Sequence, residues 1–388
     1  SACLVGSEMC IRDSNCCIGG WEIDIDYETY ERYNNMTGEL KHKILDSITQ
    51  NEDEEYCFKL CDGKCPMLDD NGLCEIHKNL GEDYLGVVCK QFPRYSEYYG
   101  TIKESGIGLA CEEAARIILS ENRPFSMETA ACDEEYEPSS EYDSSFALQI
   151  FAAREAVFKI LAKESLSIHE KLIVILDMGS KIQQCINTDE YDNIKSVVND
   201  YLKEGIAHTL DETRNLSDSG QFEDISLQQG IRQILYPYEE MEVLNPEWEV
   251  ILKDIIDSLF EQMSDEEYNI LNEEFGTYMV SRAYEYRQLL EYLVFRYFAK
   301  SIYDYDFLGK CQMLVTNFFV IRQMDIIRWL DNHREYSFKD RMDVVHIFSR
   351  QVEYSEDNIE NLYEDFIFDD IFKTDSLIAI LWIDSENI

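Results

Sequence analysis

Residues 65–94 read CPMLDDNGLCEIHKNLGEDYLGVVCKQFPR and contain Cys65, Cys74 and Cys89, three of the chain's 13 cysteines. The Asp-Asp-Asn-Gly sequence at 69–72 predicts a tight turn, and residues 80–89 predict only one or two helical turns. Thiols that cluster on short loops are held either by disulfide bonds or by a metal. This stretch therefore predicts a small irregular region organised around sulfur.

The cysteines divide the chain into two unequal parts. Ten of the 13 lie within the first 111 of the 388 residues. We therefore expect a Cys-rich metal- or cluster-binding region over residues 15–121, a polar Pro- and Ser-bearing linker over 122–145, and a helical domain over 146–388. Residues 1–14 resemble a translated sequencing adapter, so we expect a non-native leader there and leave Cys3 and Cys10 out of the ligand set.

Metal ligation is the interpretation we prefer for the Cys-rich region. Disulfide frameworks suit small secreted modules that lack a core, whereas this region is joined to a domain large enough to bury its own. Four thiolates hold either a tetrahedral zinc ion or an iron–sulfur cube, and the spacing does not choose between them. The expected ligands come from six thiols: Cys16, Cys17, Cys65, Cys74, Cys89 and Cys111.

The other thiols and the nearby histidine are interpreted as ordinary residues. The spacing Cys57-x3-Cys61-x3-Cys65 misses the x3-x2 spacing of radical enzymes by one residue, so we take Cys57 and Cys61 as simple thiols. His77 is expected to be a partly exposed histidine on a short helix. Cys185 and Cys311 lie on apolar helical stripes and are expected in the core.

The net charge of the chain restricts the classes of macromolecule that it can bind. The chain has 34 Lys and Arg against 78 Asp and Glu, a formal charge of −44. This excludes a nucleic-acid binder that works by covering phosphates, and it favours attraction to lysine-rich protein surfaces. The simpler alternative is that the charge only keeps the surface solvated. No apolar run approaches the roughly 18–20 residues of a membrane helix, so we expect a cytoplasmic protein without a membrane partner.

Helical signals dominate the rest of the chain, and only 6 Pro and 17 Gly interrupt it. Capping boxes are expected to begin helices after Ser167, Ser264 and Ser337, and residues 284–303 and 307–329 predict long apolar helices. In the Cys-rich region, residues 21–26 alternate as a short strand does, and residues 94–109 predict a hairpin that bends at Tyr99-Gly100. The expected fold is mainly α, with an irregular metal-binding region and a short hairpin packed on a helical bundle.

A few polar residues in apolar surroundings are candidates for a pocket. Arg296 and Tyr297 interrupt an otherwise apolar helix, although pairing of Arg296 with a buried carboxylate is the simpler explanation. Glu353 and Asn358 are further candidates. Gly106-Ile-Gly108 looks like part of a dinucleotide loop but lacks the third glycine, so we do not expect a Rossmann domain.

A family resemblance joins these features. Residues 15–26 (NCCIGGWEIDID), the series Cys65, Cys74, Cys89, Arg94 and Cys111-Glu-Glu-Ala-Ala-Arg, and residues 291–304 and 349–361 resemble the flagellin lysine-N-methylase family. That family is related to the CxxCxxCC metal-chelating proteins. It carries two further cysteines upstream of the Cys-Cys pair, for which only Cys3 and Cys10 are available here, at stretched spacings.

The resemblance implies a [4Fe-4S] cluster, with zinc as the alternative, and methyl transfer from S-adenosylmethionine to lysine ε-amines of flagellin. Arg94 is the candidate cofactor-binding residue, since it could contact the methionine carboxylate, although it could equally pair with an acidic neighbour. The alternatives are a methylase or maturase that acts on another lysine-bearing protein or peptide, and a zinc- or iron-binding protein without catalysis. Methyl transfer requires a neutral lysine amine, but 78 acids and 25 Tyr do not single out a catalytic base.

Overall fold

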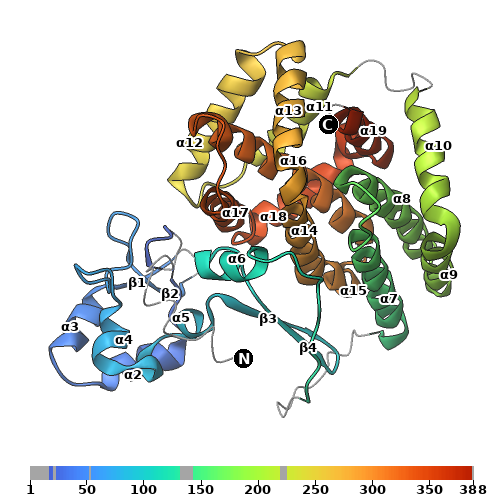
Figure 1. Ribbon diagram of the computed structural model, residues 1–388. Helices are drawn as coiled ribbons and strands as arrows, with labels where there is room; N and C mark the ends of the chain where they lie inside the picture. The colour runs from blue at the N-terminus through green and yellow to red at the C-terminus, as the bar shows by residue number, and fades with distance from the viewer. Residues whose placement is uncertain (1–16, 21–22, 52–53, 132–142, 219–224, 387–388) are drawn as a thin grey trace.

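The fold is mainly α-helical, as the sequence predicts, with two small antiparallel hairpins (Figure 1). The structure is a computed structural model. It describes residues 17–20, 23–51, 54–131, 143–218 and 225–386. A small N-terminal part, blue in Figure 1, lies beside a larger helical domain, and the hairpin β3–β4 and helix α6 lie between them.

The N-terminal part is built from short elements. They are α2 (Tyr27–Asn35), α3 (Glu39–Asp46), β1 (Ile48–Gln50), β2 (Tyr56–Phe58), α4 (Glu75–Leu80), the 3₁₀ turn Glu82–Tyr84 and α5 (Val87–Gln91). Asp26 caps α2 by accepting from Thr29 N at 2.9 Å, and it also accepts from Val87 N at 3.0 Å. One carboxylate thus joins the starts of α2 and α5, which are distant in the sequence.

The strand expected at residues 21–26 is partly described, since residues 21 and 22 lie outside the described residues. Residues 23–25 are extended beside β2, where Phe58 N donates to Ile23 O at 3.0 Å and Ile25 N donates to Tyr56 O at 2.7 Å. Ile23 and Ile25 both belong to a small core. The alternation of apolar and acidic residues therefore reflects one buried face, as expected.

The predicted hairpin is confirmed. Strands β3 (Arg94–Tyr99) and β4 (Ile102–Ile107) pair antiparallel, and Gly100 in the connecting turn has φ +61°. Helix α6 (Glu112–Leu119) follows, with Cys111 as its N-cap residue. Tyr99 and Leu119 belong to the core of the helical domain, so the two hydrophobic cores divide ahead of the hairpin. The domain boundary at residue 121 stays a prediction.

The helical domain contains most of the helices. They are α7 (Ser144–Leu161), α8 (Ile168–Asn187), α9 (Ile194–Asp200), α10 (Ile206–Asp218), α11 (Leu227–Glu239), α12 (Pro246–Ile255), α13 (Asp265–Met279), α14 (Ala283–Tyr297), α15 (Ser301–Asp304), α16 (Phe307–Asp331), α17 (Phe338–Val352), α18 (Glu356–Phe368) and α19 (Thr374–Glu386). Short 3₁₀ or π turns lie at Tyr191–Asn193, Tyr201–Gly205, Ile256–Glu261, Val280–Arg282, Phe298–Lys300 and Asp370–Phe372.

Helix α16 is the centre of this domain. It is buried along nearly its whole length and packs against α8, α11, α12, α14 and α17. The three predicted capping boxes are present at the starts of α8, α13 and α17. The helix expected at residues 284–303 is instead interrupted after Tyr297, where a 3₁₀ turn separates α14 from α15.

Candidate functional site

Four of the six predicted ligands line one small cavity in the N-terminal part. Cys17, Cys65, Cys74 and Cys89 border a space of about 40 Å³. The other lining residues are almost all apolar, among them Ile23, Phe58, Met67, Ile76, Leu85 and Phe92. Loops and short helices between positions 17 and 89 therefore bring four thiols to one place.

The turn at residues 69–72 fixes the positions of two of these thiols. The Asp69 carboxylate accepts from Asn71 N and Leu73 N, each at 2.9 Å, and from Lys78 Nζ at 2.7 Å. Cys74 is then the N-cap residue of α4, and Leu68 and Cys74 form a β-bridge. The predicted Asp-Asn-Gly turn thus returns the chain so that Cys74 lies at the same cavity as Cys65.

The apolar surroundings of this cavity change the pKa of Tyr33, one of the residues that line it. Burial, with contributions from the thiols of Cys89 and Cys74, raises the pKa of Tyr33 well above its usual range. The neutral phenol donates to Tyr84 O at 2.7 Å. Thiolates in such surroundings are unfavourable unless a cation compensates their charge.

The donor set suits a thiolate-bound metal centre, because four sulfur donors share apolar walls and no charged side chain is among the described lining residues. Among the described residues, no group of three or more His, Cys, Asp or Glu side chains is arranged as it would be around a metal ion. Cys16 lies outside the described residues. Metal binding by these thiols stays a prediction, as do the identity of the ligands and the choice between iron and zinc.

The remaining thiols lie elsewhere. Cys111 does not line this cavity; it is buried at the start of α6. Burial raises the pKa of Tyr354, and Glu353 and Cys111 make smaller contributions in the same direction. Cys57 is buried on β2 and Cys61 is exposed. Cys185 and Cys311 are buried in the helical domain, as the sequence predicts.

Two other candidates are peripheral to the thiol cavity. His77 is half-buried on α4 and does not line it, which agrees with the expected role of an ordinary histidine. Arg94 is exposed at the first position of β3, opposite Ile107. Its assignment to the cofactor stays a prediction.

A buried polar cluster lies between the hairpin and the ends of α14 and α17. Arg296 Nε lies 3.0 Å from Glu353 Oε2, so the expected pairing of this arginine with a buried carboxylate is confirmed. The phenols of Tyr292 and Tyr297 each donate to the same carboxylate oxygen at 2.9 Å. Burial raises the pKa of both tyrosines, which therefore stay protonated donors.

The cluster is incompletely paired. Neither Arg296 Nη1 nor Glu353 Oε1 has a hydrogen-bond partner among the described residues, although both atoms are buried. The Arg296 guanidinium lies over the Tyr95 ring at 4.4 Å and near the Tyr354 ring at 5.8 Å. Asn358, by contrast, binds the backbone of Glu242 and is structural.

Aromatic contacts connect this cluster to both neighbouring cavities. The ring of Phe92, which lines the thiol cavity, lies 6.2 Å from the ring of Tyr354. On the other side, Tyr95 and Tyr292 form part of the wall of a second cavity of about 350 Å³. Sequence reasoning missed this second cavity, which lies between the hairpin, α6, the segment at 123–126 and α14.

In the part of the chain that the structure describes, we find no helix with the length and hydropathy needed to span a membrane.

Comparison with known proteins points to one family. Residues 154–380 match the family model of the FliB lysine N-methylase C-terminal domain. A segment of 111 residues is 31% identical to the Lysine-N-methylases of Salmonella typhimurium and Salmonella choleraesuis, and it covers 27% of this chain and 28% of each of those proteins. The Flagellar biosynthetic protein FliU of Salmonella muenchen is 31% identical over 114 residues, which cover 28% of this chain and 68% of that protein. No solved structure matches the chain.

Proposed function

Because the chain belongs to the FliB lysine N-methylase family, whose C-terminal domain model matches more than half of it, we propose that it is a methyltransferase for lysine ε-amines of another protein. The match over residues 154–380 is the observation that carries the proposal. It includes α14 and α17, the two helices at whose ends the Arg296–Glu353 cluster lies.

S-adenosylmethionine is the methyl donor that we propose. In the transfer, the bond from the methyl carbon to the sulfonium sulfur breaks as a bond to the lysine nitrogen forms, and S-adenosylhomocysteine leaves. The lysine must first lose a proton to solvent water, because an ammonium has no free electron pair. Burial of the substrate lysine beside Tyr95 and Tyr292, which are themselves desolvated, would favour the neutral amine, since desolvation lowers the pKa of a lysine.

We propose that Cys17, Cys65, Cys74 and Cys89 hold a [4Fe-4S] cluster, with zinc as the alternative. Their shared apolar cavity supports this assignment. Such a centre would cross-link the loops of the N-terminal part and supply a site for electron transfer. The thiolate ligands agree with a cytoplasmic location, where cysteines are kept reduced.

The proposed substrate is flagellin or another lysine-bearing protein. The name of the relative FliU places that relative in flagellar biosynthesis. The charge of −44 favours the approach of a lysine-rich surface. A substrate outside the flagellum is the alternative, and a direct comparison of two protein substrates separates the two.

The test uses the full chain, purified without oxygen and loaded with iron and sulfide. It is incubated with methyl-labelled S-adenosylmethionine and either flagellin or an unrelated lysine-rich protein. Label on flagellin lysines, located by peptide mass spectrometry, supports the proposal in full. Label only on the second protein supports the methyltransferase but changes the substrate, and label on neither overturns the proposed activity.

A further inference from the structure

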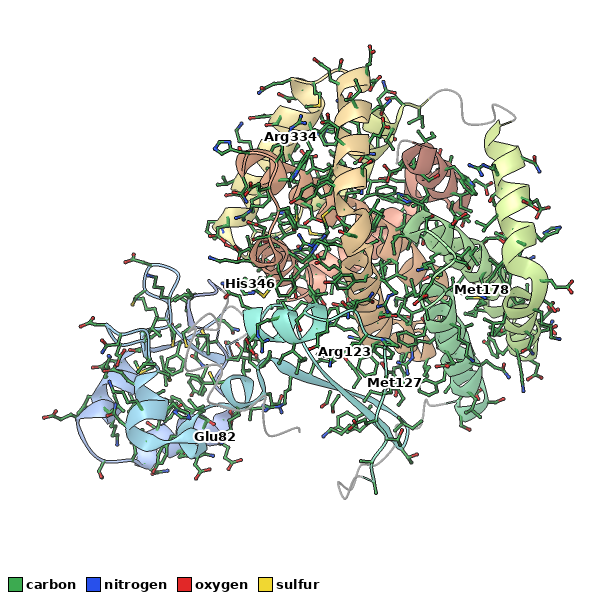
Figure 2. All side chains as sticks on the ribbon, in the orientation of Figure 1. Glu82, Arg123, Met127, Met178, Arg334 and His346 are labelled. Atoms are coloured by element: carbon green, nitrogen blue, oxygen red, sulfur yellow. The ribbon has the colours of Figure 1, made fainter. Side chains whose placement is uncertain are left out.

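The second cavity, of about 350 Å³, which is larger than the thiol cavity, is the strongest unassigned feature of the molecule. Its walls come from the hairpin, the end of α6, the segment that follows α6 and one face of α14. Arg123 lies just beyond α6 at this cavity (Figure 2). The volume is within the range of sites that bind small organic ligands.

Four aromatic side chains from three separate segments line the cavity: Tyr95, Phe125, Tyr292 and Phe295. Phe125 is held in place because its ring stacks on Phe158 at 4.2 Å between centroids. The Phe295 ring lies 5.8 Å from Phe125. Such walls suit a planar ring, and aromatic faces also attract a cation.

One polar atom in the wall is left without a partner. Gln288 is 4% exposed, and its Oε1 accepts no hydrogen bond from any described residue, whereas its Nε2 donates to Glu121 O. A buried acceptor that receives no donor is costly and is normally satisfied by a ligand or a water. The cavity thus contains an acceptor that is available for a ligand N–H or O–H.

Two charged side chains, Glu291 and Arg123, line the same cavity. Glu291 lies in the wall and is held by Arg287 Nη1 at 2.8 and 3.0 Å, so its charge is compensated within α14. Arg123 is exposed, and its guanidinium donates only to Ile117 O at 2.9 Å among the described residues. A guanidinium with remaining donors is a suitable partner for a carboxylate.

A glycine keeps the hairpin side of the cavity open. A Cβ at position 106 would lie 2.5 Å from the Tyr95 hydroxyl and 2.6 Å from its ring. Any larger residue at Gly106 must therefore displace Tyr95, which is also the ring beneath Arg296. The shape of the wall depends on this close approach.

We propose that this cavity is the S-adenosylmethionine site, an assignment that rests on the proposed methyltransferase function. The ligand combines a planar base with an amino group, a sulfonium cation and a carboxylate. The cavity offers aromatic faces for the base and the cation, Gln288 Oε1 for an N–H donor, and Arg123 for the carboxylate. Tyr292 joins the cavity to the Arg296–Glu353 cluster.

The test measures binding separately from methyl transfer. Calorimetry of the full chain with S-adenosylmethionine and with S-adenosylhomocysteine is compared for the wild type, Gln288→Leu and Gly106→Val. We expect each variant to weaken binding by roughly tenfold or more. Gln288→Leu removes the buried acceptor, and Gly106→Val displaces Tyr95 from its position in the cavity wall. Gln149→Leu is the matched control, because its Oε1 is likewise buried without a partner among the described residues but it does not line this cavity.

Photo-crosslinking of the wild type with labelled S-adenosylmethionine gives a second readout that does not depend on how the variants fold. We expect label on peptides that contain Phe125 or Tyr292. If the wild type methylates lysines but the variants bind normally, or if the label lies elsewhere, the site assignment is wrong and the proposed function stands. If the wild type binds no S-adenosylmethionine, both proposals fail.

Discussion

At the scale of single residues, the thiols of the small cavity can be tested one at a time. We expect Cys65→Ser, Cys74→Ser and Cys89→Ser each to lower the iron or zinc bound per chain severalfold, because metal centres lose affinity when one thiolate is missing. The measurement is elemental analysis with an absorption spectrum after anaerobic purification.

Two other cysteines define the limits of that ligand set. Cys61→Ser is the control, since this thiol is exposed on a loop of the same region and should leave the metal content unchanged. Cys111→Ser is informative in either direction. Loss of metal places Cys111 among the ligands, as the sequence predicts, and retention restricts the ligands to the cavity. Full retention in all the cavity variants contradicts the proposed centre.

His346 is expected to make the stability of the folded chain depend on pH. It lies on α17 where this helix meets α6 (Figure 2), and it is 5% exposed. Burial, together with the Arg350 guanidinium 3.1 Å from Nε2, lowers the pKa of His346 from 6.5 to about 4. The unfolded chain therefore binds a proton at this residue more readily than the folded chain does.

This difference in proton binding sets the direction in which the free energy of unfolding changes with pH. Stability from His346 is complete above pH 6.5 and is lost as the pH falls from 6.5 through about 4, by up to about 3 kcal/mol. We expect His346→Gln to unfold in urea with a weaker pH dependence than the wild type over this interval. His333→Gln, at an exposed position, should match the wild type. Equal pH dependence for all three proteins contradicts the prediction.

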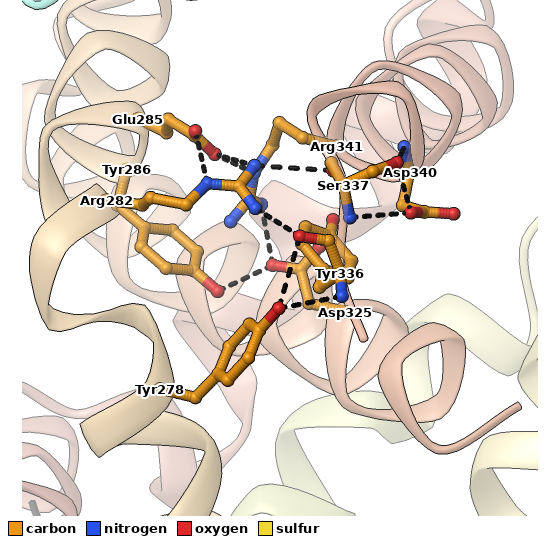
Figure 3. Close-up of polar contacts among 9 residues, drawn as sticks. All are labelled: Tyr278, Arg282, Glu285, Tyr286, Asp325, Tyr336, Ser337, Asp340 and Arg341. Carbon is orange, nitrogen blue, oxygen red and sulfur yellow. Dashed lines mark hydrogen bonds and ion pairs between the residues drawn. The ribbon is translucent and has the colours of Figure 1, made fainter. Parts of the chain in front are cut away.

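At the scale of elements, a buried ionic cluster joins α14, α16 and α17 (Figure 3). Arg341 Nη1 lies 2.6 Å from Asp325 Oδ2, and Arg341 Nε lies 3.0 Å from Glu285 Oε2. Tyr286 and Tyr336 also donate to Asp325. Arg341 thus pairs with two carboxylates from two other helices, and one of them, Glu285, also pairs with Arg282.

Removing that arginine is expected to be costly. In Arg341→Met, Asp325 loses its ion-pair partner inside the core, whereas Glu285 keeps Arg282. An uncompensated buried charge of this kind typically destabilises a protein by about 3–5 kcal/mol. Arg334→Met is the control, because its pair with Glu274 is exposed and is worth about 0–1 kcal/mol. Urea unfolding followed by circular dichroism measures both. Similar losses in the two variants would show that the buried cluster is not important for stability.

Local signals in the sequence predict helix starts better than helix interruptions. The Ser-x-x-Glu patterns at Ser167 and Ser264 predict the first residues of α8 and α13 because a capping box involves only neighbouring residues. The break after Tyr297 was not predicted. It coincides with Arg296 and Tyr297 turning to Glu353, a partner 56 positions away from Tyr297 that no local pattern reveals.

The candidate sites also differ in whether they depend on residue type alone or on contacts between distant parts of the sequence. The thiol ligands could be proposed from residue type and clustering alone, since cysteine chemistry belongs to the residue. The larger cavity could not, because it requires the hairpin around Gly106 to approach Gln288 and Tyr292 on α14. Gly106 was the available signal, but the sequence was weighed only for a dinucleotide loop, which was rejected there, and it did not reveal the close contact of Gly106 with Tyr95.

At the scale of the whole molecule, the two hydrophobic cores differ greatly in size. The smaller one extends from Ile23 to Leu85 and has nine buried residues among those described, whereas the larger one includes the hairpin and the helical domain. A core this small rarely holds a fold without a cross-link. If the proposed metal centre is present, it is therefore expected to stabilise the N-terminal part much more than the rest.

Removal of the metal should accordingly loosen one part of the chain only. After treatment with a strong chelator, we expect amide hydrogen exchange to accelerate by roughly tenfold or more over residues 54–92. Exchange in β3, β4 and α16 should stay the same, because these elements belong to the larger core. A non-chelating isomer of the reagent is the control. Faster exchange throughout the chain would show that the two cores unfold together, and no change at all would show that the N-terminal part does not depend on a metal.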